Sequence, residues 1–77
     1  MYLKRDKFLI VGISKSGIAI TELLLSKGAK CYIYDDIENV KTKENIERLE
    51  ILGAVGVSKE EIDQIIYEID IVVFLSP

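Results

Sequence analysis

The residue types best suited to chemistry lie in one segment, Gly12-Ile13-Ser14-Lys15-Ser16-Gly17, between a predicted strand and a predicted helix. The start of a helix carries unpaired backbone amides and the positive end of the helix dipole, which together can hold a phosphate. Gly12 permits a tight turn, and Gly17 allows the helix to approach the strand. Ser14 stands where a dinucleotide fingerprint has its middle glycine, so the pattern is GxSxxG. The segment predicts a phosphate-binding turn.

A pair of carboxylates, Asp35 and Asp36, follows the second predicted strand, about 20 residues beyond Gly17, which is the spacing of a nucleotide-binding unit. In a dinucleotide site such a carboxylate accepts a hydrogen bond from a ribose hydroxyl. In a uridine site it can accept from the pyrimidine N3–H instead. We therefore expect this pair to meet the nucleoside end of a ligand, although Asp36 can equally begin the following loop by capping its own backbone.

The same residues also have purely structural interpretations. Gly12 and Gly17 can serve packing alone, Ser14 and Ser16 can cap the helix, and Lys15 can be a solvated side chain. If all of these hold, the chain is a scaffold without a ligand.

Composition excludes several classes of site. The 77 residues include no histidine and one cysteine, so zinc sites, iron–sulfur sites, Ser-His-Asp sites and internal disulfides cannot be assembled. We expect no metal site and no catalytic residue, and Cys31 is best interpreted as a small core residue. The net charge of -3 does not predict the basic surface that binds nucleic acid. No apolar stretch approaches the roughly 18 residues of a membrane span, so we expect a cytoplasmic protein.

Three apolar runs at residues 8–11, 31–34 and 71–75 predict strands buried on both faces, as in a parallel sheet covered by helices. Apolar residues at helical spacing predict a helix over residues 16–27, with Gly28 as its C-terminal cap. The first 34 residues therefore predict a right-handed βαβ unit.

The remaining segments complete the sheet. Residues 35–42 predict a loop, 45–52 a helix ending at Gly53, and 54–57 a brief edge strand. Ser58-Lys59-Glu60-Glu61 matches a capping box, which predicts a helix through Tyr67 whose isoleucines at 62, 65, 66 and 69 face the core. We predict one α/β domain over residues 1–77, a Rossmann-like parallel sheet of order 3-2-1-4 with helices on both faces in three αβα layers. Because the chain ends directly after its most hydrophobic strand, we expect a fragment.

Four segments together resemble the N-terminal domain of the Mur ligases, most closely the members that add D-glutamate. They are Val11-Gly12-Ile13-Ser14-Lys15-Ser16-Gly17-Ile18-Ala19, Leu23-Leu24-Leu25 followed by Gly28-Ala29-Lys30, Tyr34-Asp35-Asp36, and Asp70-Ile71-Val72-Val73-Phe74-Leu75-Ser76-Pro77. The resemblance implies a domain that binds the UDP moiety of UDP-N-acetylmuramoyl-L-alanine. Lys15 and Ser16 match the residues that hold the diphosphate, Asp35 and Asp36 match the uracil contacts, and Ser76-Pro77 match the start of a loop closing over the uracil.

The resemblance further implies that the full-length protein is an ATP-dependent amide-forming ligase of peptidoglycan synthesis, a process tied to cell shape and division. ATP and Mg2+ are then bound by central and C-terminal domains, because no G-x-x-x-x-G-K-[ST] sequence occurs in these residues. The alternative from another class is a small NAD(P)-binding regulatory or oxidoreductase domain. The absence of a basic residue directly after Asp36 argues against NADP.

Overall fold

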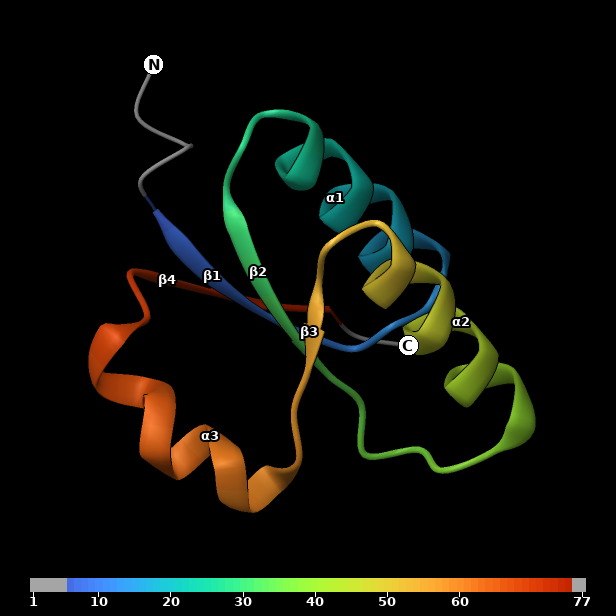
Figure 1. Ribbon diagram of the computed structural model, residues 1–77. Coiled ribbons are helices and arrows are strands. Elements are labelled where there is room, and N and C mark those ends of the chain that lie inside the picture. The colour runs from blue at the N-terminus through green and yellow to red at the C-terminus, as the bar shows by residue number, and fades with distance from the viewer. Residues whose placement is uncertain (1–5, 76–77) are drawn as a thin grey trace.

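The computed structural model describes residues 6–75 and contains one sheet of four parallel strands. The strands are β1 (Lys7–Val11), β2 (Lys30–Tyr34), β3 (Val55–Gly56) and β4 (Ile71–Phe74). Their order in the sheet is β3-β2-β1-β4 (Figure 1). The predicted α/β fold and the predicted strand order are confirmed, including the short edge strand formed by Val55 and Gly56.

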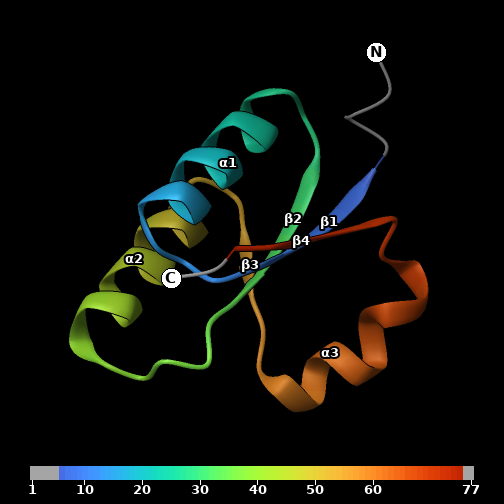
Figure 2. The ribbon, with the colours of Figure 1, turned by 180° about the vertical axis from the view of Figure 1, so that it is seen from behind.

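Helices lie on both sides of this sheet. Helices α1 (Lys15–Ser26) and α2 (Val40–Ile51) lie together on one face, whereas α3 (Lys59–Ile65) and the 3-10 helix η2 (Ile66–Glu68) lie on the other (Figures 1 and 2). Right-handed crossovers explain this division, because the chain moves outward from β1 to β3 and then returns past β2 and β1 to form β4. Within residues 6–75, no helix combines the length and apolar character needed to cross a bilayer.

The main core fills the space between the sheet and the α1–α2 layer. Ile10 and Ile33 are fully buried there, and Leu49 of α2 belongs to the same core cluster. Alternate residues such as Leu9 and Tyr32 face the α3 side. Both sets are buried, which explains why β1 and β2 are continuous apolar runs.

The α3 side is covered less completely than the sequence predicts. No residue of α3 is buried, and Ile66, expected to face the core, is 42% exposed. Strand β4 was expected to be buried on both faces, but Phe74 is 77% exposed. The reason is geometric: β4 is an edge strand, and a helix of seven residues covers only part of the sheet beneath it.

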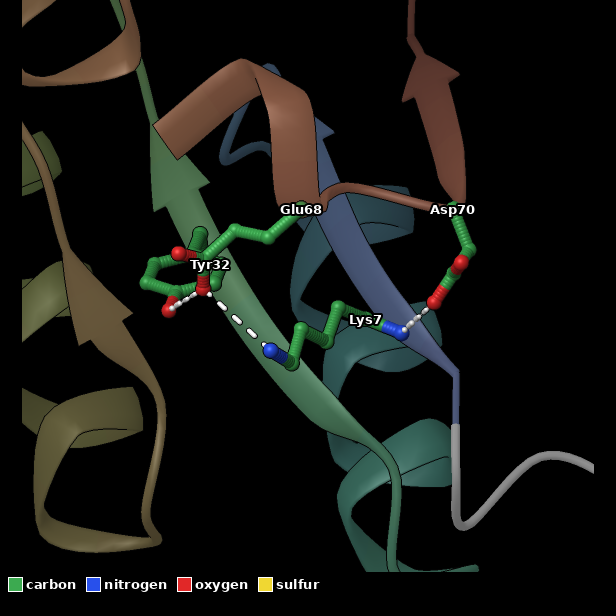
Figure 3. A network of polar contacts seen from close by, with 4 residues as sticks. All are labelled: Lys7, Tyr32, Glu68 and Asp70. Atoms are coloured by element: carbon green, nitrogen blue, oxygen red, sulfur yellow. Dashed lines mark hydrogen bonds and ion pairs between the residues drawn. The ribbon is translucent and has the colours of Figure 1, made fainter. Parts of the chain in front are cut away.

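A polar network fastens η2 and the start of β4 to Lys7 at the amino end of β1 and to Tyr32 in the middle of β2 (Figure 3). The Tyr32 hydroxyl donates to Oε1 of Glu68 at 3.0 Å, and Nζ of Lys7 lies 3.4 Å from the same oxygen. The backbone amide of Lys7 donates to Oδ2 of Asp70 at 2.8 Å. The Tyr32 hydroxyl and then Lys7 lower the pKa of Glu68. This network lies at the end of the sheet opposite the β1–α1 turn.

Local capping sets the helix boundaries. Helix α2 begins at Val40, inside the segment predicted to be a loop, because Asn39 accepts a hydrogen bond from the amide of Thr42 at 2.8 Å. The predicted capping box of α3 is present, with Ser58 and Glu61 bonding reciprocally. Gly28, at a φ of +86°, follows α1 and ends it as predicted.

Candidate functional site

Two glycines shape the β1–α1 turn at the carboxyl ends of the strands. Gly12 has a φ of +103°, and a Cβ added there would lie 2.7 Å from the carbonyl oxygen of Leu75. A Cβ on Gly17 would collide with the carbonyl oxygen of Gly12. Both glycines therefore have a packing role, and it brings the start of α1 directly over the end of β1.

The amino end of α1 has no side-chain cap. Ser14 is the N-cap residue with an extended backbone, but its hydroxyl makes no capping hydrogen bond. The first amides of a helix have no acceptor within the helix, so those of Lys15 and Ser16 remain available. Asn39 and Ser58 cap α2 and α3. The capping interpretation of Ser14 is thus not realised, and the amides at this turn are free to donate hydrogen bonds to a phosphate.

The two adjacent carboxylates have different surroundings. One oxygen of Asp35 accepts from the amide of Ile13 at 2.7 Å, and the other accepts from the amide of Ile37 at 2.8 Å. Asp35 therefore ties the β1–α1 turn to the end of β2. Asp36 is exposed and makes no hydrogen bond to any residue in the range 6–75. Asp36 is consequently the freer of the two for a ligand.

A cavity of about 960 Å³ opens between the turn, the end of β2 and one face of α2. Five of the predicted site residues line it: Gly12, Ser14, Lys15, Asp35 and Asp36. Ser16 and Gly17 lie in the adjoining first turn of α1 without lining the cavity. The predicted contacts at Ser76 and Pro77 fall outside the described residues.

Several cavity residues were not predicted from the sequence. Helix α2 contributes Lys41, Thr42, Asn45 and Arg48, and Lys59 enters from the start of α3. Their polar spacing along α2 was the available signal, but the segment around Lys41 was predicted to be a loop. A second hollow of about 420 Å³ shares six lining residues with the first, among them Asp35, Asp36, Thr42 and Lys59.

The charges around the cavity favour an anion, although the chain as a whole carries a net charge of -3. Among residues 6–75, four cationic side chains line the cavity: Lys15, Lys41, Arg48 and Lys59. Two carboxylates, Asp35 and Asp36, also line it, and backbone amides already engage Asp35. The local excess of positive charge and the open amides suit a phosphorylated ligand.

Curated relatives give the sequence relationship. Over 53 residues the chain is 42% identical to the UDP-N-acetylmuramoylalanine--D-glutamate ligases of Thermoanaerobacter sp. (strain X514) and Thermoanaerobacter pseudethanolicus (strain ATCC 33223 / 39E). The predicted resemblance to the Mur ligases is confirmed. The match covers 69% of this chain and 12% of each ligase. No protein-family model matches the chain.

Solved structures give the fold. D-lactate dehydrogenase with NAD+ from Lactobacillus jensenii superposes with a TM-score of 0.66 at 19% identity, over 100% of this chain and 20% of that one. The NAD complex of D-isomer specific 2-hydroxyacid dehydrogenase from Lactobacillus delbrueckii ssp. bulgaricus gives a TM-score of 0.65 at 21% identity, over 97% and 20% of the two chains. These likenesses establish a Rossmann-like fold.

Proposed function

We propose that the chain binds the UDP moiety of UDP-N-acetylmuramoyl-L-alanine, as the N-terminal part of an ATP-dependent ligase that adds D-glutamate in the cytoplasm. The observation that carries this proposal is the 42% identity to two UDP-N-acetylmuramoylalanine--D-glutamate ligases. The open amides at the start of α1, beside a cavity rich in cations, support it. In this proposal, no residue of this chain binds ATP or Mg2+ or takes part in the amide-forming step.

Each site residue has a distinct part in the proposal. The amides of Lys15 and Ser16 bind the diphosphate, and the exposed Ser14 hydroxyl donates a further hydrogen bond to it. The carboxylate of Asp36 accepts from the uracil N3–H. Asp35 acts through the turn, because its two oxygens hold the amides of Ile13 and Ile37.

An NAD-binding domain is the second candidate, because a carboxylate at the end of β2 can also accept from a ribose hydroxyl. Ser14 argues against it. A dinucleotide fingerprint has glycine at this position so that the pyrophosphate can lie against the backbone, and a serine there leaves less room for that approach. A diphosphate that lies slightly farther from the backbone can still bind, because the Ser14 hydroxyl can donate a hydrogen bond to it.

Isothermal titration of the 77-residue chain with UDP-N-acetylmuramoyl-L-alanine, UDP and NAD tests the proposal. We expect both uridine compounds to bind more tightly than NAD. Asp36→Asn should weaken UDP binding about tenfold, as expected for loss of a charge-assisted hydrogen bond. Asp63→Asn, which makes the same charge change on the exposed face of α3 outside both cavities, should leave it unchanged. Tighter binding of NAD than of either uridine compound would overturn the proposal.

A further inference from the structure

Helix α2 presents a polar face to the cavity, across from the first turn of α1. Lys41, Asn45 and Arg48 line the cavity and are separated by four and three positions, which places them on one side of the helix. Lys15 and Ile18 of α1 line the same cavity. The space above the β1–α1 turn therefore has a second wall, and that wall carries cations.

Of the four cations that line the cavity, Lys15, Lys41 and Lys59 have no carboxylate partner in the part of the chain that the structure describes. Arg48 is paired with Glu22 of α1, with Nη2 of Arg48 3.3 Å from Oε2 of Glu22. Lys15 and Lys41 are exposed and form no ion pair within residues 6–75. An anion between two ammonium groups offsets their mutual repulsion and interacts favourably with both.

Thr42 is a second, independent feature of this wall. Only 8% of the residue is exposed, and its amide is bound by Asn39. Its hydroxyl makes no hydrogen bond to any described residue. Because no side-chain oxygen among those residues is both fully buried and unpartnered, the Thr42 hydroxyl keeps some accessible surface. Thr42 lines both hollows, so a ligand there can reach it. A nearly buried hydroxyl in this position gains most when a ligand supplies its hydrogen-bond partner.

We propose that α2 forms the second half of a diphosphate site. Lys41 pairs with the phosphate groups that Lys15 and the α1 amides hold from the other side, and the Thr42 hydroxyl donates to a phosphate oxygen. The identity of the nucleoside rests on the proposed function, whereas the anion site itself depends only on the residues of α1 and α2. Inorganic pyrophosphate is accordingly the probe, because it carries the phosphates and no nucleoside.

Pyrophosphate titration of the 15N-labelled chain, followed by amide shifts, tests this wall. We expect Lys41→Ala to weaken binding about fivefold, the upper range for an exposed ion pair. Thr42→Val, which keeps the shape and removes the hydroxyl, should weaken it about tenfold, and Thr42→Ser should restore wild-type affinity. Lys27→Ala is the matched control, since it removes the same charge at the far end of α1, outside both cavities.

Salt separates the two contributions. At about 0.5 M KCl the effect of Lys41→Ala should shrink because the ion pair is screened, while the effect of Thr42→Val should persist. Absence of pyrophosphate binding, or equal affinities for Lys41→Ala and Lys27→Ala, would overturn the inference. Should Thr42→Val fail to fold, the Lys41 comparison decides, because that side chain is exposed. Failure of the proposed function is recognised separately, when pyrophosphate binds but UDP is bound no more tightly than NAD.

Discussion

Replacing Asp35 by asparagine removes one of two acceptors that hold the β1–α1 turn. The carboxylate accepts from the amides of Ile13 at 2.7 Å and Ile37 at 2.8 Å. Asparagine retains one acceptor oxygen and turns an NH2 group toward the other amide. Hydrogen bonds to charged groups contribute about 1.5–3 kcal/mol each, so we expect Asp35→Asn to lower the free energy of unfolding by about 2 kcal/mol. That is a large share of the roughly 4–12 kcal/mol expected for a domain of 77 residues.

Urea unfolding followed by circular dichroism measures this loss. With an m-value of about 1–2 kcal/mol/M, the midpoint should fall by about 1–2 M. Asp36→Asn makes the same chemical change at the next residue, which is exposed and makes no hydrogen bond within residues 6–75, so its midpoint should stay close to wild type. Equal midpoints for the two variants would refute the positioning role of Asp35.

Three further predictions concern other parts of the fold. Gly17→Ala should lower the free energy of unfolding by about 1–3 kcal/mol, seen as a lower melting temperature, because its Cβ collides with the carbonyl of Gly12. The Tyr32 hydroxyl and nearby lysines lower the pKa of Glu68 from its ordinary 4.5, so the stability that its carboxylate contributes at higher pH is lost as the pH falls through that region. Glu68→Gln should therefore flatten the acid limb of a stability–pH curve, and an unchanged limb would contradict the network. Burial raises the pKa of Cys31 to about 11, so its thiol should react with iodoacetamide at about pH 8 far more slowly in the native chain than in urea.

Secondary structure was predictable where a local signal and the tertiary fold agree. The apolar runs of β1 and β2, the glycine after α1 and the capping box at Ser58 all have short-range causes, and each is confirmed. The start of α2 was missed because Val40 is 72% exposed and its first turn lacks an apolar pattern. Asn39 was the available signal for that helix start. The exposure of β4 was not predictable because it depends on how much of the sheet α3 covers.

The candidate site was predictable in its centre and not at its edges. A parallel sheet places the ends of its strands and the starts of the following helices at one edge. The positions of Ser14, Lys15 and the acidic pair at the cavity were therefore predictable. Asp35 bonds to backbone amides and Asp36 does not, and this difference depends on amide positions that no sequence pattern specifies. Thr42 and its neighbours on α2 reach the cavity only through packing of α2 beside α1.

The proposed function requires uridine diphosphate to bind at the β1–α1 turn. Amide shift mapping of the 15N-labelled chain during titration with UDP tests it most directly. We expect the largest shifts at Ser14 to Gly17 and at Asp35 to Ile37, with little change at Lys7 and Asp70 on the opposite end of the sheet. Largest shifts at Lys7 and Asp70, or no shifts at saturating UDP, would contradict it.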